Sequence, residues 1–150
     1  MTDSKQTLNE LKLKAEGGDI ESQFLLGSAY DKGEGVEPNQ TEAIFWYEKS
    51  AEGGNIDALY NLALSYQNGE GVQKDSQKAV KLYTRAASQG DGDSQFNLGE
   101  IYEKGIGVQK DLKEAEKWYS KAKESGDEEA ENCLLRVKQS RDKESVHFED

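Results

Sequence analysis

Apolar and small residues recur along the chain at the spacing that places side chains on one face of a helix. Ser22, Leu26, Ala29 and Tyr30 stand four, three and one residues apart, so a helix would bring all four to the same side. A second stripe of this kind follows within residues 43–50. No stretch alternates convincingly between apolar and polar residues, and the pattern therefore predicts helices and no strands.

The two stripes belong to a unit that recurs every 36 residues without a gap. Rows that begin at Ala15, Ala51 and Ala87 align position by position, and a fourth row from Lys123 keeps the pattern for about half its length. Neither stripe is wide enough to be buried by one hairpin alone, so neighbouring units must stack on each other. The sequence thus predicts an all-α solenoid of helix–loop–helix repeats. The predicted repeats are 15–50, 51–86 and 87–122.

Incomplete repeats are expected at both ends of this single solenoid domain. Residues 1–14 are predicted to form an N-terminal capping helix, with Leu8 and Leu11 facing the first full repeat. Residues 123–138 are predicted to form a C-terminal capping helix. The charged tail, 139–150, has few apolar residues, so we expect the helix to fray there.

Helix boundaries are predicted from residue type. Glycines that follow each first stripe are suited to the left-handed conformation that ends a helix, at Gly33, Gly69 and Gly105. A loop of five or six residues is expected before the second helix. Short polar residues that accept backbone N–H bonds are expected to cap the helices, and the pairs Asn39–Glu42 and Asp111–Glu114 have capping-box spacing. The other predicted N-caps are Asp19, Asn55, Asp75, Asp91 and Asp127.

The excess of acidic over basic residues argues against some classes of binding partner. The 150 residues include 30 acidic and 19 basic side chains, for a net charge of −11. Nucleic acids and anionic membranes repel such a surface, so neither is expected as a partner. The single cysteine permits no internal disulfide, and no apolar run reaches the length of a membrane span. These features favour a soluble protein of the cytoplasm.

The aligned rows share the pattern A-x-x-G-x-x-x-A-x-x-x-L-G-x-x-Y-x-x-G-x-G-V-x-x-D-x-x-x-A-x-x-W-Y-x-x-A. This pattern resembles the Sel1-like repeat, a longer-looped relative of the tetratricopeptide repeat. Ala63, Leu82 and Gly92 depart from it only mildly. The resemblance implies a right-handed superhelix whose first helices line a concave surface. It also implies an adaptor that assembles other proteins rather than an enzyme.

A search for reactive groups points away from catalysis. The glycine-rich loops lack the lysine and serine of a phosphate-binding loop, so we interpret them as helix ends. His147 is the only histidine, Cys133 has no base nearby in the sequence, and neither has a partner for a metal site. Some cysteine-rich relatives have been described as β-lactamase-like, but this chain lacks their paired cysteines. No catalytic residue, cofactor or metal is predicted.

The concave face that the resemblance implies is the predicted binding surface. Helical geometry places Phe24, Tyr60 and Phe96 in a ladder along it, flanked by carboxylates. These rings either contact a bound partner or simply pack between helices, and the sequence leaves both interpretations open. Carboxylates beside rings suit a basic or apolar segment of another protein. The candidate partner-binding residues are Glu21, Phe24, Asp31, Asp57, Tyr60, Asn61, Leu64, Asp93, Phe96, Asn97 and Glu100.

The leading hypothesis is therefore a non-catalytic scaffold or adaptor that holds a partner segment in this groove. Small size and acidity also fit a cytoplasmic immunity or inhibitor protein that neutralises a toxin or enzyme. A hydrolase related to the β-lactamase-like members is the third alternative.

Overall fold

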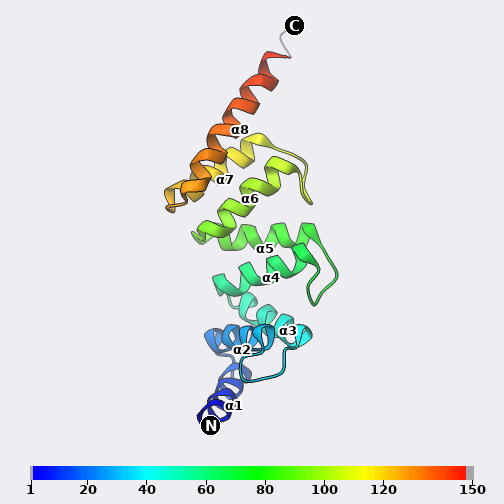
Figure 1. Ribbon diagram of the computed structural model, residues 1–150, viewed down its shortest axis with the longest axis vertical. Helices are drawn as coiled ribbons and strands as arrows, with labels where there is room; N and C mark the ends of the chain where they lie inside the picture. The colour runs from blue at the N-terminus through cyan, green and yellow to red at the C-terminus, as the bar shows by residue number, and fades with distance from the viewer. Residues whose placement is uncertain (1, 148–150) are drawn as a thin grey trace. The chain divides into compact units, whose positions relative to one another are not determined.

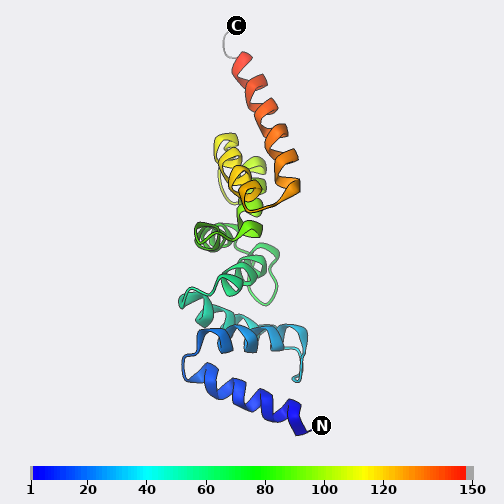
Figure 2. The same cartoon turned by 90° about the vertical axis from the view of Figure 1, so that its left-hand side faces the viewer.

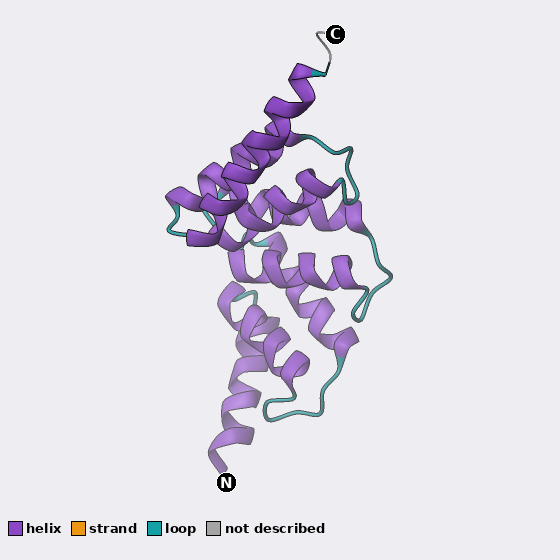
Figure 3. Ribbon diagram, turned by 45° about the horizontal axis from the view of Figure 1, so that its top comes forward, coloured by secondary structure: helices purple, strands orange, loops and turns teal. Residues whose placement is uncertain are grey.

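The computed structural model describes residues 2–147, with residues 2–6 as backbone alone, and shows only helices and loops over that range (Figures 1 and 3). The predicted all-α fold is confirmed. Internal contacts divide the chain into an N-terminal unit, Met1–Asp75, and a C-terminal unit, Ser76–Asp150.

The N-terminal unit contains four helices in sequence order. They are α1 (Thr2–Glu16), α2 (Ile20–Lys32), α3 (Gln40–Glu52) and α4 (Ile56–Asn68). Helices α2 and α3 pair most extensively and form a hairpin, while α1 packs on α2 and α4 packs on α3 (Figure 2). Ala15, Leu26 and Trp46 are buried together at the α1 end of this unit. Leu8 and Leu11 pack against this cluster and so face the first full repeat, as predicted.

The C-terminal unit repeats the arrangement of the N-terminal unit helix for helix. Its helices are α5 (Ser76–Ser88), α6 (Gly92–Lys104), α7 (Leu112–Glu124) and α8 (Glu128–Val146). Helices α6 and α7 form the hairpin, with α5 and α8 packed on it. One buried cluster of this unit combines α7 with α8. The members are Leu112, Ala115, Tyr119, Cys133, Leu134 and Val137.

Helix caps form where the residue types predict them. The side chains of six predicted N-caps accept backbone N–H bonds, at Asp19, Asn39, Asn55, Asp91, Asp111 and Asp127. Gly33, Gly69 and Gly105 each have φ of 72° and end the first helix of a repeat in the left-handed conformation. Residues other than glycine are strained in this backbone conformation, which explains why glycine recurs at this position of each repeat.

The loop and the capping box differ from expectation. Seven residues join the helices of each hairpin, at 33–39 and 105–111, rather than five or six. The longer loop carries the backbone N–H of Asn39 back to the carbonyl oxygen of Tyr30, at 2.9 Å. Asp111 donates in the same way to the carbonyl of Tyr102. Since the backbone N–H of the N-cap residue is already bonded, Glu42 and Glu114 do not accept a hydrogen bond from it. Only the bond from the helix backbone to the N-cap side chain forms in each capping box.

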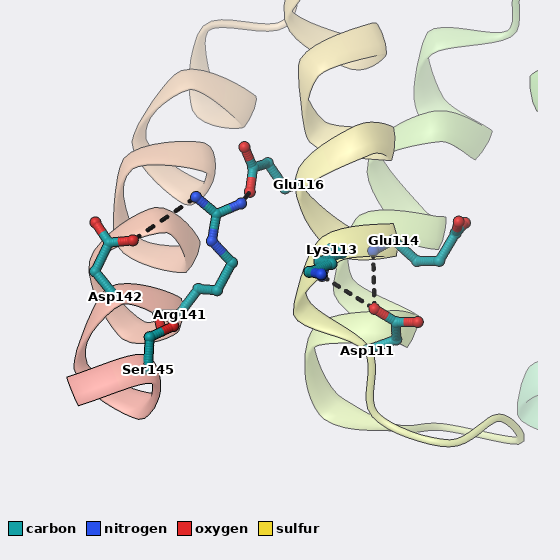
Figure 4. Close-up of polar contacts among 7 residues, drawn as sticks. All are labelled: Asp111, Lys113, Glu114, Glu116, Arg141, Asp142 and Ser145. Carbon is teal, nitrogen blue, oxygen red and sulfur yellow. Dashed lines mark hydrogen bonds and ion pairs between the residues drawn. The ribbon is translucent and has the colours of Figure 1, made fainter. Parts of the chain in front are cut away.

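The C-terminal helix is longer than predicted. Helix α8 continues to Val146, so residues 139–146 are helical where a frayed tail was expected, and 148–150 lie outside the described residues. No glycine or proline interrupts this stretch, and Arg141 occupies the position of the glycines that end earlier first helices. Arg141 pairs with Glu116 of α7 (Figure 4), and Lys110 pairs with Glu144 at 3.5 Å. The Arg141–Glu116 contact links these extra turns to α7.

Candidate protein-binding surface

The predicted site residues lie on the first helices of the repeats and none is buried. Helix α2 carries Glu21, Phe24 and Asp31, helix α4 carries Asp57, Tyr60, Asn61 and Leu64, and helix α6 carries Asp93, Phe96, Asn97 and Glu100. The aspartates and Glu21 are exposed, while the other candidates are half-buried. Each unit therefore presents carboxylates to solvent beside partly covered rings and amides.

In the N-terminal unit, polar contacts bring α2 and α4 together across α3. Asn55, the N-cap of α4, donates to Glu21 Oε2 at 3.2 Å. The hydroxyl of Tyr47, from α3, donates to Asp31 Oδ2 at 3.3 Å. Burial raises the pKa of Tyr47 to about 12, Asp31 adds to the shift, and a hydrogen bond from Asn61 opposes it. Tyr47 is thus a neutral donor that joins two of the predicted site residues.

The C-terminal unit has an equivalent junction with an added cation. The Tyr119 hydroxyl of α7 donates to Glu103 Oε2 at 2.6 Å. Arg136, from α8, donates to both oxygens of Glu103, at 2.9 and 2.8 Å. The hydrogen bond from Arg136 lowers the pKa of Glu103, and burial raises the pKa of Tyr119. Glu103 is therefore an ionised acceptor whose charge is matched within the protein.

Two rings of the predicted ladder pack on the tyrosines of these junctions. Phe24 stacks on Tyr47, with ring centroids 5.9 Å apart and an angle of 30° between planes. Phe96 meets Tyr119 at 5.6 Å and 59°. The packing interpretation therefore holds for both phenylalanines. Because both rings remain half-buried, contact with a partner stays a prediction for their open faces.

The comparisons with known proteins identify the repeat. Residues 20–55, 56–91 and 92–127 match the Sel1 repeat. The chain belongs to the Sel1 repeat family. These matches have the 36-residue period of the sequence pattern and begin at the first helix of each hairpin. Proteins of this family generally act as scaffolds that bind other proteins.

Solved Sel1 repeat structures share the fold, and this chain spans about half of the length of one of them and about a quarter of another. A Sel1 repeat protein from Oxalobacter formigenes is 40% identical, with a TM-score of 0.81 over 86% of this chain and 53% of its own. The protective antigen c5321 of uropathogenic Escherichia coli is 36% identical, with a TM-score of 0.83 over 87% of this chain and 28% of its own. Helicobacter pylori cysteine rich protein B is 26% identical, with a TM-score of 0.68 over 88% of this chain and 95% of its own. Among curated proteins, none matches this chain.

The Glu103–Arg136 pair was missed as a site feature by the sequence analysis. Arg136 stands in the same repeat position as Ser28, Leu64 and Glu100, so the row alignment already placed it on the predicted binding face. The fourth row was interpreted only as a cap. Reading its charges in register would have found the cation, although not its bidentate contact with a residue 33 positions away.

The side chains considered for catalysis or metal binding are Cys133 and His147. Cys133 is buried between α7 and α8, and His147 is exposed at the end of α8. Across residues 2–147, no cluster of three potential metal ligands is found, and no helix is long and apolar enough to span a bilayer. The surface offers carboxylates, amides and rings, which form ion pairs, hydrogen bonds and stacking contacts.

Glu103→Gln is expected to lower the free energy of unfolding by about 1–2 kcal/mol at neutral pH, because a charge-assisted contact to a partly exposed arginine is lost. The folded-state pKa of Glu103 lies below its usual value of 4.5. Its contribution is therefore present above pH 4.5 and is lost as the pH falls through the folded-state pKa. Urea unfolding across pH should show the two proteins converging in acid.

The matched control for this experiment is Glu124→Gln, an exposed glutamate on the same unit. This variant should track the wild type at every pH. A gap between Glu103→Gln and wild type that persists unchanged well below pH 4.5 would mean that the ionised carboxylate is not what stabilises the junction.

Proposed function

We propose that this Sel1 repeat chain is a non-catalytic scaffold whose first helices bind a basic, partly apolar segment of another protein. The family's general role supports protein binding. The choice of a basic segment rests on the charge of the first-helix face.

The N-terminal unit carries most of the net negative charge. Residues 1–75 contain 14 acidic and 6 basic side chains, for a net charge of −8, whereas residues 76–150 contain 16 and 13, for −3. Glu21 and Asp57 on its first helices are exposed. The surrounding excess of carboxylates attracts lysine and arginine and speeds encounter with a basic segment.

The face of the C-terminal unit is closer to neutral. Arg136 neutralises Glu103, and Lys104 lies 3.7 Å from Glu100. A basic segment would have to displace these internal cations before it could pair with the carboxylates. The single observation that carries the proposal is thus the exposed, internally unmatched acidity of α2 and α4 in the N-terminal unit.

The half-buried rings suit the apolar part of such a segment. Phe24, Tyr60 and Leu64 lie on the same helices as the exposed carboxylates. Phe24 is held in place by its stacking on Tyr47, so little side-chain freedom remains to be lost on binding. A rigid ring beside a carboxylate is a common anchor for an arginine or lysine side chain.

The double variant Glu21→Lys/Asp57→Lys is expected to bind the partner at least ~10-fold more weakly than wild type at low salt, which corresponds to about 1.4 kcal/mol. The partner would first be captured from cytosol on the immobilised chain and identified by mass spectrometry. Calorimetry with the purified partner then measures Kd. Added salt should shrink the difference, because exposed charges are screened.

The control is Glu16→Lys/Glu52→Lys, which makes the same change of charge at exposed positions on second helices. It should lose much less affinity. Equal losses of affinity in the two double variants would show that binding depends on net charge alone. Full binding by Glu21→Lys/Asp57→Lys would show that the α2–α4 face does not bind the partner.

A further inference from the structure

We propose that the outer face of α7 binds a short acidic segment of another protein through a lysine row, Lys113, Lys117 and Lys121. This binding is independent of the basic segment proposed for α2 and α4, because it concerns the other unit and a partner of opposite charge. The reasons are the distribution of charge over α7, the ring that holds two of the lysines, and the surroundings of the row.

The charged side chains of α7 are sorted by exposure. Those that are fully exposed are four lysines and one glutamate, at Lys113, Lys117, Lys121, Lys123 and Glu124. The other carboxylates of this helix, on Glu114 and Glu116, are half-buried and pair with Lys117 and Arg141. In a chain with a net charge of −11, the outer face of α7 is thus a local reversal of charge that attracts carboxylates.

The lysine row has a regular spacing. Lys113, Lys117 and Lys121 are four residues apart, so they follow one another along one side of the helix at intervals of about 6 Å. In an extended chain, alternate side chains point the same way and are about 6.6 Å apart. An extended segment with carboxylates at alternate positions therefore matches the row.

Two lysines of the row are held beside a single ring. The Nζ atoms of Lys117 and Lys121 lie 4.9 and 4.8 Å from the centre of the Trp118 ring. Trp118 is only 5% exposed, so its ring is a fixed support for both ammonium groups. Two like charges beside one ring repel each other, and a carboxylate placed between them would attract both. Because the lysines are already held, less side-chain freedom is lost when a partner binds.

Lys113 and Lys121 carry charge that the unit does not match. Across residues 7–147, no ion pair joins either of them to a carboxylate. Lys113 also lines a cleft of about 300 Å³ between the start of α7 and α8. The other cations of this cleft, Lys110 and Arg141, already pair with carboxylates of α8 and α7. Lys113 is therefore the cation that the cleft offers to a partner.

The neighbouring second helix extends the basic surface. Helices α5 and α7 share most of their buried repeat positions, so they also expose the same positions. Lys81 of α5 is exposed at the position of Lys117, and α5 contains no carboxylate. In the first repeat this position holds Phe45, which packs edge-on against Trp46 with ring centroids 5.0 Å apart. The pair of cations beside one ring thus belongs to the C-terminal unit.

The surroundings of the row favour a protein segment over other polyanions. Nucleic-acid bases stack on exposed rings, and the ring beneath the lysines is buried. Binding in a membrane interface uses exposed apolar side chains, and α7 exposes no large one. The C-terminal unit as a whole has a net charge of −3. A long polyanion would therefore meet repelling carboxylates beyond the row, whereas a short acidic segment would not.

The probe for this face is the fluorescein-labelled peptide Glu-Ser-Glu-Ser-Glu-Ser-Glu-Ser, and fluorescence anisotropy at low salt measures its Kd for the 150-residue chain. Lys113→Glu/Lys117→Glu/Lys121→Glu should bind the peptide at least ~10-fold more weakly than wild type, because attraction becomes repulsion. The matched control is a triple variant with the same change of charge at exposed positions of α6 and α8, Lys104→Glu/Lys138→Glu/Lys143→Glu. It should lose much less affinity.

Circular dichroism checks that each variant folds, and Lys113→Gln/Lys117→Gln/Lys121→Gln replaces the charge reversal if that variant unfolds. A wild type that does not bind the peptide up to ~1 mM, the range of weak association, overturns the proposal. Equal losses of affinity in the control also overturn it. Tighter binding of wild type to oligothymidine, or to vesicles of phosphatidylserine and phosphatidylcholine, than to the peptide would assign the lysine row to a nucleic acid or a membrane instead.

Discussion

Tyr119→Ala is expected to lower the free energy of unfolding of the C-terminal unit by about 3–5 kcal/mol, the range for removing a large buried ring. Tyr119 is fully buried, and its ring packs with Ala115 and Val137 in the cluster that joins α7 to α8. The substitution also removes the ring on which Phe96 rests and the hydroxyl that donates to Glu103. Urea unfolding followed by circular dichroism measures the loss.

Tyr119→Phe separates the two contributions. It keeps the ring and removes only the hydroxyl, so it should destabilise by about 1.5–3 kcal/mol, the net value of a hydrogen bond to a charged group. If the alanine and phenylalanine variants were equally destabilised, the ring would contribute nothing beyond its hydroxyl, which is incompatible with its complete burial.

Gly99→Val is the second substitution with a large expected effect, a loss of about 1–3 kcal/mol from overpacking. The new Cβ would meet the Tyr119 ring at 2.5 Å, and that ring has no free space to move into because it is buried. Gly99→Ala should lose less, because alanine favours helix over glycine and Ala63 occupies this position in the second repeat. The same unfolding measurements give both values.

A double-mutant cycle tests the cause. Gly99→Val/Tyr119→Leu should be more stable than the sum of the two single losses predicts, because a smaller ring-side residue relieves the contact. Strict additivity would show that valine destabilises through the backbone alone.

The sequence predicts the helices well because their determinants are local. The 36-residue period, the glycines at Gly33, Gly69 and Gly105, and the polar N-caps each act within a few residues of where they stand. The length of α8 was misjudged for the opposite reason. Few apolar residues follow Gln139, but the last turns are held by Arg141 and Glu116, which are 25 positions apart and paired only once the helices pack.

The candidate site was predicted in outline but not in its contacts. Helical periodicity placed Asp31, Phe24 and Asn61 on the first helices, where they lie. Periodicity could not show that Tyr47 of the second helix would form hydrogen bonds with Asp31 and Asn61, because those bonds depend on how closely α2 approaches α3. The charge-matched state of Glu103 likewise depends on a partner from another repeat. Such contacts follow from packing and not from spacing.

The long loop of each hairpin is closed at its base. The backbone N–H groups of Asn39, Asp75 and Asp111 all donate to a tyrosine carbonyl, at 2.9 Å, so both ends of the loop are held together whatever lies between them. The entropic cost of closing a loop rises only slowly as the loop is lengthened. Tags, labels or whole binding peptides inserted near residues 35–37 would therefore leave the helices undisturbed, and the repeat offers a regular series of grafting sites.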